Sequence, residues 1–151
     1  MGILDLYRRF GIKFDHIYAY EMRPHDTAQV FAQVPEAYEA AYHWINLGVA
    51  ADPNSRQNPF RMLKQNYNED DLVIVKLDVD TPDLERKLAE QSKSDPALAK
   101  LIDHFYFEHH VHQAELKHAW GRGAGITETV AESLELFSQI RQQGIPAHFW
   151  V

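Results

Sequence analysis

Residues 70–82, DDLVIVKLDVDTP, decide the fold class that this sequence predicts. An apolar run from Leu72 to Val75 continues through Lys76 and Leu77 and then meets two carboxylates, Asp78 and Asp80. A β-branched run this short predicts a strand that is buried on both faces, as in parallel sheets. Ligands of open α/β sheets bind outside the carboxyl ends of the strands, so these two acids are the first candidates for a functional site.

Helical and strand patterns alternate along the rest of the chain. The spacing of apolar residues predicts strands over 16–20, 44–49, 72–77, 102–107 and 147–151. Helices are expected over 3–10, 26–31, 35–42 and 96–101, and in segments that begin at 59, 82 and 130. The alternation predicts an α/β fold: a three-layer, Rossmann-like domain over residues 1–151, with a mainly parallel sheet of about five strands and helices on both faces.

Several helix ends carry recognisable capping residues. Asp26 and Asn58 each precede a helical pattern as N-caps, and Thr129 with Glu132 forms a capping box. Pro35 is expected at the first position of the helix over 35–42. Thr81 or Asp80 is expected to cap the helix that follows Pro82.

Composition limits the classes of protein that this chain can belong to. It has 151 residues, 45% of them hydrophobic and 25% charged, which is typical of a soluble globular domain. No apolar run reaches the roughly 20 residues that span a bilayer, and the N-terminus lacks the apolar core of a signal peptide, so no membrane association is expected. The chain has no cysteine, which excludes disulfides and thiolate chemistry and fits a cytoplasmic location. Its net charge of -7 argues against nucleic acid as a partner.

Acidic side chains follow three of the predicted strands. Glu21 ends the first, Asp78 and Asp80 the third, and Glu108 the fourth. In a parallel sheet these ends share one edge, where carboxylates accept ribose hydroxyls, act as general acid and base, or hold a hard divalent ion. The alternative is that these acids cap helices and solvate loops.

Five of the nine histidines lie within fifteen residues, at positions 104, 109, 110, 112 and 118. Their spacing matches no specific metal motif, and HExxH is absent. His109 and His110 are the best functional candidates because they directly follow a strand. The segment 121–125, GRGAG, precedes a helix and could contact phosphate there, but no strand comes before it, so we expect a flexible loop.

Three segments together carry a resemblance to a known family. They are IYAYE at 17–21, INLGVA at 45–50 and VKLDVD at 75–80, with Glu85 downstream. In order and spacing they resemble the later part of the class I S-adenosylmethionine-dependent methyltransferase fold, and most closely its FkbM-like branch. The second of the two acids in the third segment is followed by Thr81, where that family usually has glycine.

The resemblance implies a cofactor and a set of site residues. It implies that Glu21, with the adjacent Met22, holds the ribose of S-adenosylmethionine and that Asp78 also lies at the cofactor. It implies that Asp78, together with Glu108 and His109 or His110, lines the site of a small-molecule methyl acceptor.

The segments that resemble the family do not include its first strand and its glycine-rich cofactor loop, which should lie upstream of Glu21. We therefore expect a rearranged sheet or a homodimer. Two other functions stay open: a non-catalytic α/β binding or oligomerisation module, and a metal-dependent lyase or hydrolase that uses Asp78, Asp80, Glu108 and the histidines. A dehydrogenase is disfavoured because no strand–GxGxxG–helix unit exists.

Overall fold

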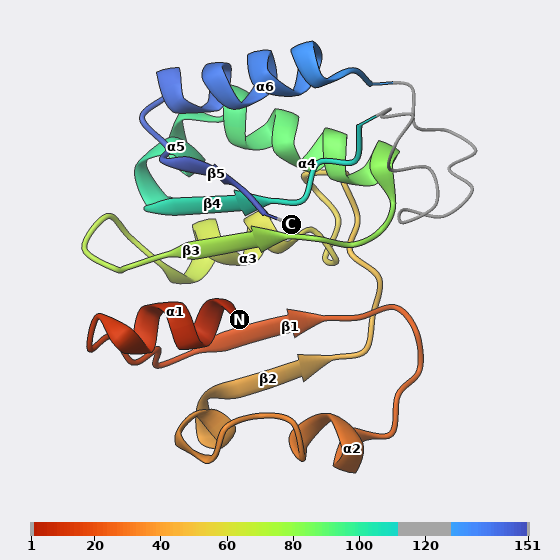
Figure 1. The fold of residues 1–151 in the computed structure, drawn as a ribbon, viewed down its shortest axis with the longest axis vertical. Coiled ribbons are helices and arrows are strands. Elements are labelled where there is room, and N and C mark those ends of the chain that lie inside the picture. Colours follow the sequence, from red (N-terminus) through yellow and green to blue (C-terminus); the bar gives the residue numbers. More distant parts are fainter. Residues whose placement is uncertain (1, 112–127, 151) are drawn as a thin grey trace. The chain divides into compact units, whose positions relative to one another are not determined.

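The computed structural model describes residues 2–111 and 128–150 and shows a mixed α/β chain with two small parallel sheets (Figure 1). The chain forms two compact units, residues 1–49 and 50–151. The sequence predicts one sheet of about five strands, whereas the strands form a two-stranded and a three-stranded sheet. That prediction is therefore correct in class and in strand direction but wrong in how the strands join.

The unit 1–49 contains one parallel strand pair. Its elements are α1 (Ile3–Arg9), β1 (Ile17–Tyr20), α2 (Thr27–Phe31), the 3-10 helix η1 (Glu36–Ala41) and β2 (Tyr42–Ile45). β1 and β2 pair in register from Ile17 opposite Tyr42 to Tyr20 opposite Ile45. All eight residues of the two strands are half-buried.

Local sequence signals explain most of the boundaries in this unit. Gly11 follows α1 with a φ of 76°, a left-handed conformation that glycine adopts without steric cost. The Asp26 carboxylate caps α2 by accepting from Ala28 N at 2.8 Å. The helix predicted over 35–42 is instead a 3-10 helix with Pro35 at its N-cap, and the next strand starts at Tyr42 rather than at residue 44.

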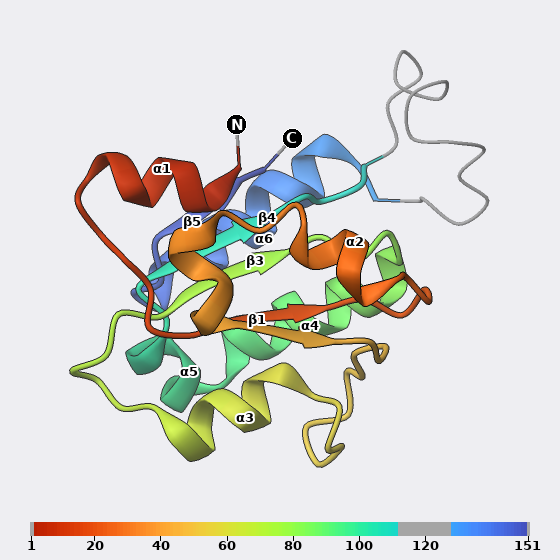
Figure 2. The same ribbon diagram turned by 90° about the horizontal axis from the view of Figure 1, so that it is seen from below.

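The unit 50–151 contains the three-stranded sheet. Its elements are α3 (Pro59–Asn66), β3 (Ile74–Leu77), α4 (Pro82–Ser94), α5 (Pro96–Leu101), β4 (His104–Phe107), α6 (Val130–Gln142) and β5 (Ala147–Phe149). The strands run parallel in the order β3-β4-β5. Figure 1 shows α4 and α6 on one face of this sheet, and Figure 2 gives the view from below.

Alternation along β4 identifies the buried face of the sheet. Phe105 and Phe107 are fully buried, whereas His104 and Tyr106, which alternate with them along the strand, are half-buried. Phe137 of α6 packs on the buried face, with its ring centroid 5.9 Å from that of Phe107. Full burial of an aromatic side chain of this size stabilises a fold by roughly 2–3 kcal/mol, so these rings fix α6 against the sheet.

Caps define the helices of this unit as well. Asn58 and Asp95 cap α3 and α5, each followed by proline, and Thr129 forms the expected capping box with Glu132. The expectation for α4 is wrong in part: Thr81 is its N-cap residue, but the Thr81 side chain makes no capping hydrogen bond.

Two of the clustered histidines, His112 and His118, and the segment 121–125 lie outside the described residues. Within the described part of the chain, no helix has both the length and the apolar character needed to cross a membrane.

Candidate active site at the carboxyl ends of β3 and β4

Two carboxylates meet where neighbouring parallel strands end. Asp78 directly follows β3 and Glu108 directly follows β4, in a register that sets Leu77 opposite Phe107. The Glu108 backbone N–H donates to Leu77 O at 3.1 Å, which continues the ladder to the end of the strands. Lys76 Nζ donates to Asp78 Oδ2. The structure thus brings together two of the acids that the sequence predicts at one sheet edge.

Opposite pKa shifts separate the roles of these two acids. Burial alone would raise the pKa of Asp78, but hydrogen bonds with Lys76 and Glu108 and the charges of Lys76 and His110 hold that pKa below its usual value. Burial raises the pKa of Glu108, and its hydrogen bond with the Asp78 carboxylate raises it further. The contact between the two carboxyl groups thus moves their pKa values apart, that of Glu108 upward and that of Asp78 downward.

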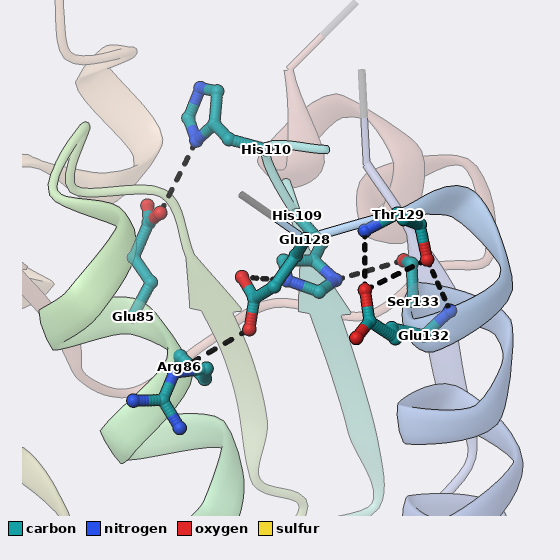
Figure 3. Close-up of polar contacts among 8 residues, drawn as sticks. All are labelled: Glu85, Arg86, His109, His110, Glu128, Thr129, Glu132 and Ser133. Carbon is teal, nitrogen blue, oxygen red and sulfur yellow. Dashed lines mark hydrogen bonds and ion pairs between the residues drawn. The ribbon is translucent and has the colours of Figure 1, made fainter. Parts of the chain in front are cut away.

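His110 lies at the same edge against a buried carboxylate. Its Nδ1 is 3.2 Å from Glu85 Oε2, and its Nε2 is 3.9 Å from Asp80 Oδ1. Glu85 belongs to α4 and is fully buried, and its Oε1 accepts from Val79 N at 2.8 Å. Figure 3 shows the His110 ring set above the Glu85 carboxylate. One buried acid thus connects the turn after β3 to the histidine after β4.

The turn after β3 has an unusual backbone at Asp80. Its φ of 52° is left-handed, which costs a residue with a Cβ of order 1 kcal/mol or more. Such strain persists only where the surroundings impose it, and here Glu85 holds the neighbouring Val79 N–H. The Asp80 side chain is 73% exposed, so it stands at the open side of the site.

His109 points to a different set of partners. Its Nδ1 is 2.8 Å from Ser133 Oγ on α6, and its Nε2 is 3.0 Å from Glu128 Oε2, which in turn faces Arg86 of α4 (Figure 3). The ring also stacks on Phe107 at 4.8 Å between centroids. Both nitrogens of this predicted catalytic residue therefore serve a network that joins the end of β4 to α4 and α6 and reaches the surface at Arg86.

The predicted cofactor residues Glu21 and Met22 lie in the other unit, after β1. Glu21 Oε1 accepts from Arg23 N at 2.6 Å, and Oε2 is 3.9 Å from His25 Nε2. Asn46 Nδ2 donates to Glu21 O and Arg23 O at 2.7 Å each and fixes the loop. A held, partly exposed carboxylate fits an acceptor of ribose hydroxyls, because each of its oxygens can take more than one hydrogen bond. Met22 is 72% exposed and packs beside Gly48.

A hollow of about 350 Å³ lies in the same unit, lined in part by His25, Tyr42 and Trp44. Its lining does not include Glu21 or Met22. It therefore does not coincide with the predicted ribose-binding residues.

The described residues do not assemble a metal centre. No group of three or more histidine, aspartate or glutamate side chains in 2–111 and 128–150 is placed to hold a metal ion. The acids and histidines at the sheet edge instead pair with one another or with Lys76.

Sequence reasoning missed the roles of Lys76 and Glu85. Lys76 interrupts an apolar strand, and a charged residue at such a position indicates a side chain that faces away from the core. Glu85 lies three residues before Leu88, which puts both on one face of a helix, and both are fully buried. An acid on the apolar face of a helix is a signal that a buried partner exists.

Comparison with protein-family models, curated proteins and solved structures found no match. The functional argument therefore depends on the geometry of the strand ends.

Proposed function

We propose that this chain is an S-adenosylmethionine-dependent methyltransferase-like domain of Rossmann-like type, in which the unit 50–151 supplies the acceptor site. The observation that carries the proposal is the hydrogen-bonded pair of Asp78 and Glu108, which meet at the carboxyl ends of the adjacent parallel strands β3 and β4. Strand ends of this kind are where open α/β sheets bind their ligands.

The chain's own groups have distinct roles in this proposal. Lys76 holds the Asp78 carboxylate, and the oxygens of Asp78 and Glu108 offer hydrogen-bonding positions to the acceptor molecule. Glu21, with Met22 beside it, would hold the cofactor ribose. S-adenosylmethionine, when bound, supplies a methyl group on a cationic sulfur. Such chemistry depends mainly on positioning, so a few fixed polar groups suffice.

Isothermal titration calorimetry with S-adenosylhomocysteine and S-adenosylmethionine tests this function. The wild-type chain is expected to release heat with a dissociation constant below about 1 mM, and Glu21→Gln is expected to weaken binding about tenfold or more. Glu69→Gln, which changes an exposed acid paired with Lys100, is the matched control and should bind as the wild type does. Absence of heat at about millimolar ligand would contradict the proposal.

One observation favours a second candidate, a module that works by self-association. β1 and β2 form a sheet of only two strands, and all eight of their residues are half-buried. Small sheets of this kind need a third strand or a packed partner for stability. A homodimer could supply that cover. Size-exclusion chromatography with light scattering decides this candidate, and a monodisperse monomer at all concentrations tested would exclude it.

A further inference from the structure

Glu85 is the most deeply buried acid at the sheet edge, and it has two nitrogen partners. Its side chain has 0% exposure in a chain whose other site acids are partly open to solvent. Oε1 is 2.8 Å from Val79 N, and Oε2 is 3.2 Å from His110 Nδ1. A buried carboxylate is tolerated only where hydrogen-bond donors surround it, so these two contacts account for its presence in the core.

The hydrogen bond from Val79 N occupies one oxygen of Glu85 and leaves the other oxygen to His110. Val79 N–H can only donate, so Oε1 is an acceptor. An ionised carboxylate has no proton to give, and the His110 nitrogen that faces Oε2 must then carry a hydrogen. We propose that Glu85 is a positioning residue that fixes neutral His110 as the Nδ1–H tautomer, so that Nε2 is the nitrogen that gains and loses a proton.

The surroundings of Nε2 show where that proton would be used. Nε2 is 3.9 Å from the exposed Asp80 carboxylate, and the charge of His110 acts on both Asp78 and Glu108. Among the described residues, the carboxyl groups that act on this ring are Glu85 at Nδ1, Asp80 near Nε2, and the pair of Asp78 and Glu108 through their charge.

Within the proposed function, on which this use of the ring depends, His110 takes the proton of an acceptor group that carries one. The bond between the acceptor atom and its hydrogen breaks, the N–H bond forms at Nε2, and the electron pair stays on the acceptor atom. Glu85 takes no part in the transfer itself. It holds the neutral ring in the tautomer that carries its hydrogen on Nδ1 and its lone pair on Nε2.

Two-bond ¹H–¹⁵N correlation spectra of the full chain, labelled with ¹⁵N-histidine, test the assignment. Loss of one signal set in His110→Asn identifies the ring. In the wild type, the neutral form seen at the alkaline end of a pH titration should carry its hydrogen on Nδ1, and the proton gained on acidification should appear on Nε2.

Glu85→Gln is the decisive variant. Its amide oxygen can still accept from Val79 N, but the amide nitrogen now faces His110 Nδ1 and donates to it, which reverses the tautomer. Glu128→Gln is the matched control, because Glu128 contacts His109 in the same way at 3.0 Å and should leave the His110 spectrum unchanged.

Each outcome decides the proposal. An Nδ1–H tautomer in the wild type that reverses in Glu85→Gln supports it. An Nε2–H tautomer in the wild type, or an equal mixture of both, overturns it, because Glu85 would then be a donor or would not control the ring. The wild-type spectrum alone settles the matter if Glu85→Gln does not fold. S-adenosylhomocysteine calorimetry on the same samples tests the proposed function separately, since the tautomer is read without any ligand.

Where methyl transfer to an acceptor is measurable, the wrong tautomer in Glu85→Gln is expected to lower kcat by about 100-fold or more. Loss of binding would raise KM and would point to the cofactor site instead.

Discussion

Replacing Glu85 by alanine tests whether the buried acid holds the site together. The change removes two hydrogen bonds to a carboxylate, and each such bond is worth about 1.5–3 kcal/mol. Part of the stability that these hydrogen bonds contribute is offset in the native protein by the cost of burying the carboxylate. Alanine also leaves the Val79 N–H without its acceptor and a small void beside Leu88. We therefore expect a net loss of about 3 kcal/mol of unfolding free energy.

Urea denaturation followed by tryptophan fluorescence measures this loss, since the chain has three tryptophans. A loss of about 3 kcal/mol would also lower Tm by about 6–12 °C in a chain of this size. Glu90→Ala is the matched control: it lies on the same helix, is 43% exposed and pairs only with the nearby Lys93 among the contacts described. That variant should cost at most about 1 kcal/mol.

The unfolding free energy of Glu85→Gln should lie between those of Glu85→Ala and Glu90→Ala, because glutamine keeps an acceptor for Val79 N–H. The reasoning is refuted if Glu85→Ala is no less stable than Glu90→Ala. That result would mean that the desolvation of the carboxylate cancels both of its hydrogen bonds, and that the acid contributes nothing to the stability of the turn after β3.

Three further predictions follow from individual residues. Ser92 is fully buried, and its Oγ has no hydrogen-bond partner among the described residues. Ser92→Ala should therefore raise the unfolding free energy measured by urea denaturation by about 1 kcal/mol. A lower unfolding free energy would show that the hydroxyl has a partner. Asp80→Gly should retain or gain stability, whereas Asp80→Val should lose about 1–2 kcal/mol, because only glycine adopts a φ of 52° without cost; equal stability of the two variants would contradict the strain. Because the fold raises the pKa of Glu108, the favourable contribution of this side chain to the unfolding free energy is present below the ordinary glutamate pKa. That contribution is lost as pH rises through the folded pKa. Glu108→Gln should therefore gain stability relative to wild type as pH rises from the ordinary value of 4.5 through the folded pKa. The pKa of Asp78 is lowered, so the contribution of this carboxylate to stability is present above its ordinary pKa of 3.8 and is lost as pH falls through the folded pKa. Asp78→Asn should thus be most harmful near neutral pH, and flat pH profiles for both variants would contradict the opposite pKa shifts.

The sequence predicts the helices and strands well because their signals are local. Asp26, Asn58 and Thr129 cap the helices that they were expected to cap, since a capping side chain bonds to backbone groups only two or three residues away. The segment after Pro35 is a 3-10 helix because propensity does not distinguish a short α-helix from one with tighter turns.

The division of the strands between two sheets could not be predicted in the same way. Strand pairing joins segments far apart in the chain, and an alternating apolar pattern does not identify the neighbour of a strand. β1 pairs with β2 and β3 with β4, each with its neighbour in the chain, but nothing local in Val75 or Tyr18 identifies these partners.

The candidate site shows the same limit. Asp78, Glu108 and His110 were predictable from their position after strands, because parallel strand ends share an edge. Their hydrogen-bond partners were not predictable. Lys76 contacts Asp78 and Glu85 contacts His110 only through the three-dimensional arrangement of the chain.

Burial separates the acids of this edge into two kinds with different consequences. Glu85 is sealed from solvent and contacts two nitrogens, so it connects the turn after β3 to the ring of His110. Asp78 is partly exposed and hydrogen-bonded to Glu108, and this contact moves the pKa values of the two acids apart. If Glu85→Gln changed the pH dependence of stability as strongly as Glu108→Gln, this separation would not exist, and the edge would have to be treated as one coupled acid cluster.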